Sequence, residues 1–212
     1  MAVNVETIAC YGTLSGLPQK VQDIIVGGLL GDAHAERHGK NLGNTRIEFK
    51  QGVIHTPYLF FIYFQLLFWG YVTAFTPLPK STSDGKAGTH QFLRFRTKRL
   101  PVFNWFRDLF YPAGIKIVPA IIGLLLTPRA FAYWIMDDGG YRASGMILHT
   151  NSYTKADVML LISVLDSNFG IKATIRVVGK KWVIYVPAAY MPTVQSVVLP
   201  YMHSSMLYKI HA

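Results

Sequence analysis

In "YWIMDDGG", residues 133–140, an apolar run ends in two adjacent acids and two glycines. A second stretch, "IIVGGLLGDA" at residues 24–33, has the same design. Asp32 of this stretch aligns with Asp138 of the other, half a chain length away. Each apolar run is opened by a proline, which favours the first turn of a helix. The sequence therefore predicts two copies of one unit, each with a helix that ends in an acid.

The segments after the two acids follow the same order. Alternating apolar and polar residues predict strands at 44–52 and at 145–152. The second half continues with a helix whose capping residue is Thr154 and with a hairpin at 171–187. In the first half, the stretch 76–88 is rich in Pro, Ser and Gly, and we interpret it as a loop before a strand.

Composition indicates a globular, basic protein. Hydrophobic residues make up 51% of the chain, which excludes a disordered protein, and the net charge of +10 favours a polyanionic partner such as nucleic acid. A single cysteine, Cys10, excludes an internal disulfide and any multi-cysteine metal site. The N-terminal residues show no targeting pattern, so we expect the protein to be made in the compartment where it works.

One stretch raises the alternative of a membrane protein. Residues 58–75 carry no charge over 18 positions, the length at which a membrane-spanning helix is considered. Gln65 and Gly70 interrupt the stretch, and we interpret Thr56-Pro57 as the N-cap and first turn of a globular helix. We therefore expect a buried helix and no membrane partner.

Two further patterns occur in both halves. Basic residues alternate with apolar ones in "LRFRTK" at 93–98 and in "IKATIRVV" at 171–178, so each half presents one cationic face. A solvated surface is the plain interpretation, but a basic pair of strands also fits the DNA major groove. In addition, Lys116 and Lys209 occupy matching places after the last helix of each half. This match indicates a shared role for the two lysines.

These residues resemble the LAGLIDADG homing endonucleases in their single-chain, two-motif form. Both "VGGLLGDA" and "AYWIMDDGG" are similar to the namesake motif, and the likeness runs from about residue 18 to residue 210. The resemblance implies an α+β fold of two pseudo-symmetric αββαββα repeats. The motif helices would meet at the central interface, and antiparallel sheets would form a DNA-binding saddle. We expect an N-terminal segment at 1–17 and repeats at 18–120 and 121–212.

The resemblance also implies the roles of the site residues. Asp32 and Asp138 would coordinate divalent metal beside the scissile phosphates, with the backbone carbonyls of Gly31 and Asp137 nearby and the Asp137 side chain secondary. Lys116 and Lys209 would stabilise the transition state. Mg²⁺ is the expected ion, with Mn²⁺ as a substitute and Ca²⁺ binding without supporting cleavage.

The expected partner is a long double-stranded DNA site, cut on both strands by a monomer. The implied DNA contacts lie on the strands and on the residues that follow them: Arg46, Glu48, Lys50, Arg94, Arg96, Lys98, His149, Asn151, Lys172, Thr174 and Arg176. The organellar group I intron branch is the most similar, which implies synthesis within a mitochondrion or chloroplast. An intron RNA maturase is the first alternative function, and a basic membrane protein is the distant second.

Two details complete the expectations. Tyr133 and Trp134 stand where the first motif has Gly27 and Gly28, so we expect an asymmetric helix contact and unequal cutting of the two strands. His34 and His38 have the spacing of zinc ligands on a helix, but they lie just past a helix end, so we do not expect a zinc site.

Overall fold

The computed structural model describes residues 14–37, 39, 43–83 and 89–212, and their elements form two units of the same order. The first unit contains α2 (Gln19–Leu30), β1 (His34–Arg37), β2 (Thr45–Gly52), α3 (Thr56–Phe68), β3 (Lys80–Ser83), β4 (Thr89–Arg96) and α4 (Asn104–Phe110). The second contains α6 (Pro128–Asp138), β5 (Gly139–Arg142), β6 (Gly145–Leu148), α7 (Lys155–Phe169), β7 (Thr174–Val178), β8 (Lys181–Pro187) and α8 (Met191–Val198). A short helix, α5 (Ile122–Leu125), joins them. The predicted αββαββα repeat is therefore confirmed.

Short 3-10 helices connect several of these elements. They are η1 (Val53–His55), η2 (Pro101–Phe103), η3 (Pro112–Gly114), η4 (Ala188–Tyr190), η5 (Leu199–Tyr201) and η6 (Ser204–Lys209). The side chain of Asn168 on α7 donates to the carbonyls of Gly123 and Leu126 at 2.8 and 3.2 Å, so the connecting helix packs with the second unit. The repeat boundary at residues 120 and 121 stays a prediction.

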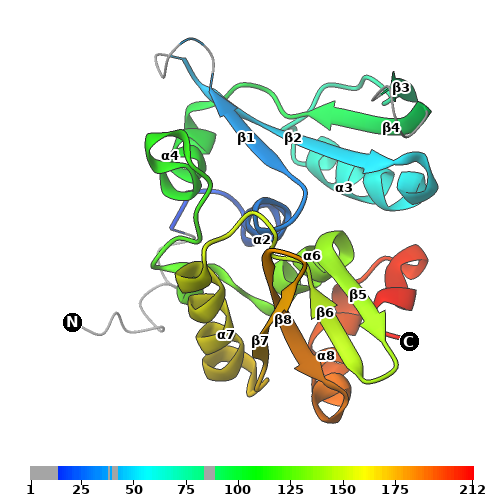
Figure 1. The fold of residues 1–212 in the computed structure, drawn as a ribbon. Coiled ribbons are helices and arrows are strands. Elements are labelled where there is room, and N and C mark those ends of the chain that lie inside the picture. The colour runs from blue at the N-terminus through cyan, green and yellow to red at the C-terminus, as the bar shows by residue number, and fades with distance from the viewer. Residues whose placement is uncertain (1–13, 38, 40–42, 84–88) are drawn as a thin grey trace.

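Each unit builds one four-stranded antiparallel sheet with the same topology. The strand orders are β1-β2-β4-β3 and β5-β6-β8-β7. In Figure 1 the two sheets lie on either side of α2 and α6, which occupy the middle of the molecule. Strands β1 and β5 each begin within two residues of a motif acid, and they hold the same place in their sheets. The segments that follow the two acids therefore lie at equivalent positions.

Three local expectations about these elements were wrong, and two strands were not anticipated. The stretch 76–88 is not all loop, since it contains β3, which pairs with β4. The strand expected at 145–152 ends at Leu148, so His149 and Asn151 lie beyond it. Thr56 does not cap α3, because its hydroxyl donates to the Val53 carbonyl at 2.6 Å and the helix follows directly from η1. Two short strands directly after the motif acids, β1 and β5, were not located in the sequence.

The uncharged stretch 58–75 was expected to lie in one buried helix, but that helix, α3, has only 13 residues, begins at Thr56 and ends at Phe68, and a turn follows it. Helix α3 packs on β2 and β4 with one face, while Phe64 and Phe68 on its other face are 58% and 84% exposed. The chain turns at Gly70, whose φ of +75° suits glycine. Within the part of the chain that the structure describes, every helix is too short or too polar to cross a membrane.

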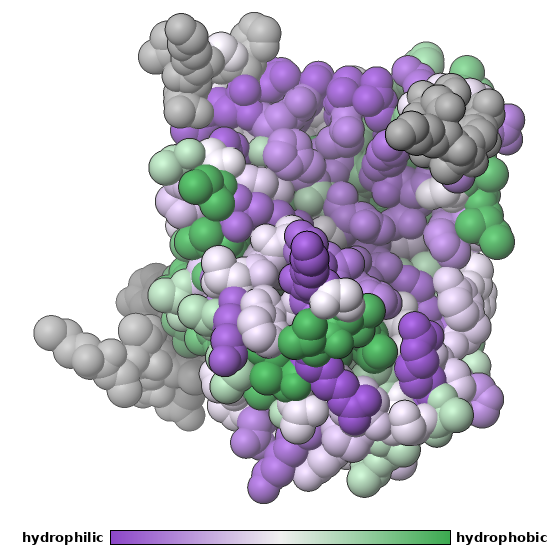
Figure 2. All heavy atoms as spheres, viewed as in Figure 1, coloured by the Kyte–Doolittle hydropathy of each residue, from purple (hydrophilic) through white to green (hydrophobic). Residues whose placement is uncertain are grey.

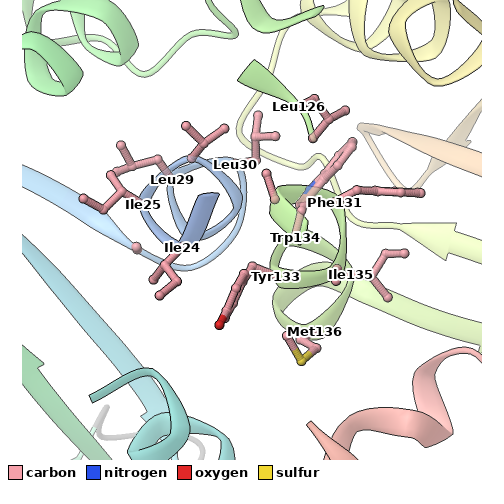
Figure 3. Packing of buried hydrophobic residues seen from close by; sticks show 14 of the residues in the cluster. Ile24, Ile25, Leu29, Leu30, Leu126, Phe131, Tyr133, Trp134, Ile135 and Met136 are labelled. Carbon is pink, nitrogen blue, oxygen red and sulfur yellow. The ribbon is translucent and has the colours of Figure 1, made fainter. Parts of the chain in front are cut away.

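The two motif helices, α2 and α6, pack directly against each other (Figure 3). A Cβ on Gly27 would lie 2.3 Å from the Ala130 carbonyl oxygen and 2.5 Å from Tyr133 Cβ, so only glycine permits this approach. Tyr133 lies between the helices, as Figure 3 shows, and the asymmetric contact expected from the sequence is present. Gly28 was expected to face the second helix, but it faces Phe49 of β2 instead.

Apolar burial holds this interface together. Most residues of both helices are buried, among them Ile24, Leu29, Phe131 and Trp134, which are fully inaccessible to solvent. Each such side chain contributes about 1.5–3 kcal/mol on removal from water. A buried, tightly packed pair of helices therefore fixes the positions of the two acids at their ends.

Candidate active site at the junction of the motif helices

Three carboxylates gather where α2 and α6 end. Asp32 follows α2 after one residue, and Asp137 and Asp138 close α6. The Gln51 amide joins the two halves, because its Nε2 donates to Asp32 Oδ2 at 2.9 Å and to Asp137 Oδ1 at 3.0 Å. Sequence alignment paired Asp32 with Asp138, and the helix packing brings both to one site.

The electrostatics of the cluster favour a cation. Burial first, and then the Asp32 charge, raise the pKa of Asp138 from 3.8 to about 7, although two lysines act against this rise. Burial and the charges of Asp32 and Asp138 also raise the pKa of Asp137 well above its usual range. Carboxylates that repel one another in a partly buried site are stabilised by a bound metal ion.

Lys116 and Lys209 reach the site symmetrically. Lys116 Nζ donates to the carbonyl of Gly31 at 2.9 Å, and Lys209 Nζ donates to the carbonyl of Asp137 at 2.5 Å. Each lysine thus contacts the residue just before the motif acid of its own half. Burial lowers the pKa of both lysines, while the surrounding carboxylates act in the opposite direction.

The side chain of Asp137 is occupied by protein donors. Its Oδ1 accepts from the Tyr58 hydroxyl at 2.9 Å as well as from Gln51, and its Oδ2 accepts from the Asp32 backbone N–H at 3.2 Å. The side chain lies over Gly31, where a Cβ would come within 2.5 Å of Asp137 Cβ. Position 31 in the first motif must therefore be glycine, because the Asp137 side chain of the second motif fills the space that a side chain there would need.

Gln51 and Tyr58 were missed by sequence reasoning. Gln51 is the one residue with a detectable signal, because it continues the buried alternation of Thr45, Ile47 and Phe49 on β2 with a polar amide. A polar residue in the apolar phase of a strand needs a partner in the interior. Tyr58 has no comparable signal, since its hydroxyl partner depends on how the two halves meet.

The oxygen donors at the site fit Mg²⁺ or Mn²⁺. The Asp32 and Asp138 carboxylates and the carbonyls of Gly31 and Asp137 are hard ligands of the kind these ions prefer. Among the described residues, no three His, Cys, Asp or Glu side chains form a metal cage by themselves. Such a donor set suits an ion whose remaining ligands come from water and a phosphate group.

The first sheet presents a ladder of ion pairs on its polar face. Glu48 pairs with Arg96 at 2.5 Å and with Arg94 at 3.7 Å, while Glu36 pairs with Arg46 and lies 3.8 Å from Arg96. The opposite faces of the same strands are buried, as the predicted alternation requires. Figure 2 shows hydrophilic residues gathered over β1, β2 and β4.

Two residues continue this surface. Lys50 extends over the Phe92 ring at 4.1 Å. Lys98 is exposed just beyond the end of β4. The basic residues predicted for the first half are thus brought onto one face, where the carboxylates of Glu36 and Glu48 orient several of them.

The second sheet is less regular than expected. Thr174 and Arg176 are exposed on β7, and the Arg176 guanidinium lies 3.2 Å from the centre of the Tyr185 ring. Lys172 is exposed but precedes the strand. The alternation of this segment predicts Val177 on the apolar face, but its side chain is 56% exposed near the end of the edge strand β7.

The residues after β6 divide between the site and the surface. The His149 backbone N–H donates to the Asp138 carbonyl at 3.0 Å, which places this residue beside the carboxylate cluster. Asn151 is exposed in the turn before α7. His34 contacts the Tyr111 hydroxyl at 3.2 Å, and its suggested zinc partner, His38, lies outside the described residues.

Two acids, two lysines and two antiparallel sheets surround one helix interface, so the chain consists of two similar halves with a carboxylate cluster where they meet. The model of the LAGLIDADG DNA endonuclease family matches residues 22–194. The chain therefore belongs to the LAGLIDADG family, and the family expected from the sequence is confirmed.

Relatives of this chain carry two kinds of name. The chain is 35% identical over 203 residues to the cytochrome b mRNA maturase bI2 of Saccharomyces cerevisiae, an alignment covering 92% of this chain and 48% of the relative. It is 38% identical over 119 residues to the intron-encoded endonuclease ai4 of Dictyostelium discoideum, covering 55% of this chain and 75% of that protein. The chain thus spans about half the length of the yeast relative.

Solved structures share the fold. The homing endonuclease I-WcaI bound to its DNA recognition sequence superposes with a TM-score of 0.83 at 23% identity, covering 99% of this chain and 98% of that one. A substituted I-DmoI in complex with its nicked target DNA and manganese gives a TM-score of 0.53 at 15% identity, covering 86% of this chain and 96% of that one. These likenesses establish the two-repeat fold.

Proposed function

We propose that this protein is a homing endonuclease that makes a metal-dependent double-strand break in a long DNA site. The observation that carries the proposal is the matched pair of lysines, each of which reaches the carbonyl before the motif acid of its own half. Two equivalent sets of acid and lysine suit two phosphodiester cuts, one on each strand. Family membership supports DNA as the substrate.

Asp32 and Asp138 would hold divalent metal, with the carbonyls of Gly31 and Asp137 as neighbouring oxygen donors. When bound, Mg²⁺ supplies an activated water and neutralises charge on the leaving oxygen. Lys116 and Lys209 would contribute positive charge at the scissile phosphates and hold a water by hydrogen bonding. We expect Mn²⁺ to substitute and Ca²⁺ to bind without supporting cleavage.

The polar faces of the two sheets would hold the DNA. Arginines oriented by Glu36 and Glu48 suit base edges in the major groove, and exposed lysines such as Lys50 and Lys98 suit phosphates. His149, Asn151, Lys172, Thr174 and Arg176 would extend the contact over the second half. Since one chain contains both halves, we propose that it acts as a monomer.

A relative that is named for cytochrome b mRNA supports synthesis within a mitochondrion, and a chloroplast is the alternative. The same similarity supports a second candidate function, an intron RNA maturase on the same fold. Intact acids and lysines at both sites favour the nuclease, because RNA binding alone does not require carboxylates that are clustered with lysines at one site.

The test of the nuclease uses a duplex that joins the exons flanking the intron that encodes the chain, with a different label on each strand. We expect cleavage of both strands in Mg²⁺ and binding without cleavage in Ca²⁺. Asp138→Asn should stop cleavage of one strand and retain binding in Ca²⁺, while Asp166→Asn, an exposed acid on α7, serves as the matched control. Absence of cutting at every Mg²⁺ and Mn²⁺ concentration would refute the nuclease.

The maturase alternative is tested with the same protein and the transcribed intron. Tight binding of that RNA, combined with faster splicing in Asp32→Asn and wild-type protein alike, would support it. Binding to the intron RNA that is no tighter than binding to an unrelated RNA of equal length would exclude the maturase function.

A further inference from the structure

The side chain of Asp137 has a distinct set of contacts, which cross from one half to the other. The residue belongs to α6 of the second half, yet its carboxylate accepts from Tyr58, Gln51 and the Asp32 backbone, all in the first half. Tyr58 is fully buried and Gln51 is 8% exposed, so their bonds to Asp137 are partly shielded from solvent, whereas the bond from the Asp32 backbone N–H lies at the exposed edge of the site. Hydrogen bonds to a carboxylate in such surroundings are strong and directional.

The matching position in the first half cannot do the same. Asp137 aligns with Gly31, which has no side chain and could not carry one, because a Cβ there would meet Asp137. The strand partner differs too. Glu48 pairs with the second residue after Asp32, and Ile147 pairs with the second residue after Asp138, so Gln51 corresponds to Thr150.

Thr150 does not repeat the role of Gln51. It is fully buried, and its hydroxyl donates to the Trp182 carbonyl at 2.8 Å. The Asp32 centre is therefore braced through Gln51 Nε2 and the carboxylate of Asp137, whereas the Asp138 centre has the Thr150 hydroxyl turned toward its own sheet. The two centres differ in their support although their acids and lysines match.

We propose that the Asp137 side chain, held by Tyr58, is a positioning residue for the Asp32 centre of the opposite half and makes the two cleavage centres unequal. The inference rests on the proposed nuclease function. Through its Oδ2, Asp137 fixes the backbone N–H of Asp32, and it shares the Gln51 amide with the Asp32 carboxylate. Partners of this kind orient metal ligands without touching the metal.

Tyr58→Phe is the decisive variant, because it removes only the hydroxyl that holds Asp137. Asp32→Asn and Asp138→Asn first identify which labelled strand depends on each acid. Tyr58→Phe should then slow cleavage of the Asp32-dependent strand about tenfold and leave the other strand within about twofold. Nicked DNA that is cut only on the Asp138-dependent strand should accumulate.

A matched control is available on the same helix. Tyr63 is 4% exposed and its hydroxyl donates to the Thr73 carbonyl at 3.0 Å, away from the carboxylates, so Tyr63→Phe removes a comparable bond. It should slow neither strand selectively. Asp137→Asn is the second variant, since its amide would face a donor at Oδ1 or at Oδ2 in either orientation. It should slow the Asp32-dependent strand more than the other.

A second readout does not depend on cleavage. In an Asp138→Asn background, Mn²⁺ bound at the remaining centre of the protein–DNA complex can be titrated by electron paramagnetic resonance. Tyr58→Phe should weaken this Mn²⁺ binding about tenfold, and Tyr63→Phe should not change it. Equal slowing of both strands, or unchanged Mn²⁺ affinity, would overturn the inference. A wild-type protein that cuts neither strand would instead refute the nuclease function itself.

Discussion

Replacing Asp138 with Asn should make the metal-free protein more stable at alkaline pH. In the folded protein the pKa of Asp138 is about 7, against an ordinary value of 3.8. Ionising this acid in the folded state therefore costs about 4 kcal/mol by the usual conversion. Because the side chain is only partly buried, water screens the interaction, and we expect a gain of roughly 1–2 kcal/mol for Asp138→Asn.

The sign of the pH dependence is opposite to that of a salt-bridged acid. The unfavourable free energy of ionising Asp138 acts in full above pH 7, where this acid is ionised in both the folded and the unfolded chain. It declines as the pH falls from about 7 to 3.8, because the folded protein then binds a proton that the unfolded chain lacks. The advantage of the asparagine variant should decline with it.

Urea unfolding in EDTA at about pH 8.5 and about pH 4.5 measures both effects. Asp166→Asn, at an exposed position, is the control and should change stability little at either pH. Mg²⁺ should abolish the advantage of the variant by stabilising the wild-type protein, since a ligand that binds only the folded state adds to its stability. An asparagine variant that is less stable than wild type at the higher pH would refute the view that burial, together with the charge of Asp32, disfavours the ionised form of Asp138.

Three further predictions concern packing, catalysis and pH. Gly27→Ala should cost about 1–3 kcal/mol in urea unfolding, because its Cβ would overlap Ala130, whereas Gly123→Ala, with 3.5 Å to Val164, should be nearly neutral; equal effects would contradict the packing described. Lys116→Met and Lys209→Met should each slow one strand about 10- to 100-fold in single-turnover cleavage, with Lys20→Met as an exposed control; a shared loss on both strands would argue against separate centres. At limiting Mg²⁺, cleavage should rise with pH through about 7, as Asp138 loses its proton, and extra Mg²⁺ should move this rise to lower pH; a profile insensitive to Mg²⁺ would exclude proton competition at Asp138.

The sequence was sufficient for the repeat, the motif helices and the pairing of Asp32 with Asp138. These features depend on local patterns, since the apolar run and the terminal acid together specify a helix end. Thr154 was correctly identified as a cap, and α7 begins there with a capping box that Asp157 completes. Local chemistry decides such features, so one sequence is enough to predict them.

Features that depend on contacts between distant segments could not be predicted. The strand β3 has the sequence "KSTS", which shows no apolar alternation, and it forms because β4 offers a partner. The buried face of α3 could not be predicted from its many aromatic residues, because the exposed side of the helix is apolar as well. The partners of Asp137 come from β2, α3 and the end of α2, and no local pattern joins these three segments.

The contact between Tyr133 and Gly27 makes the interface between the two halves asymmetric. Tyr133 Cβ lies where Gly27 has no side chain, so two first halves would place glycine against glycine at this point and two second halves would place tyrosine against tyrosine. Each half is thereby matched to its own neighbour and mismatched to a copy of itself. A chimaera that takes one half from a relative would have to keep the residues at positions 27 and 133 matched. This contact would therefore determine which halves can be combined.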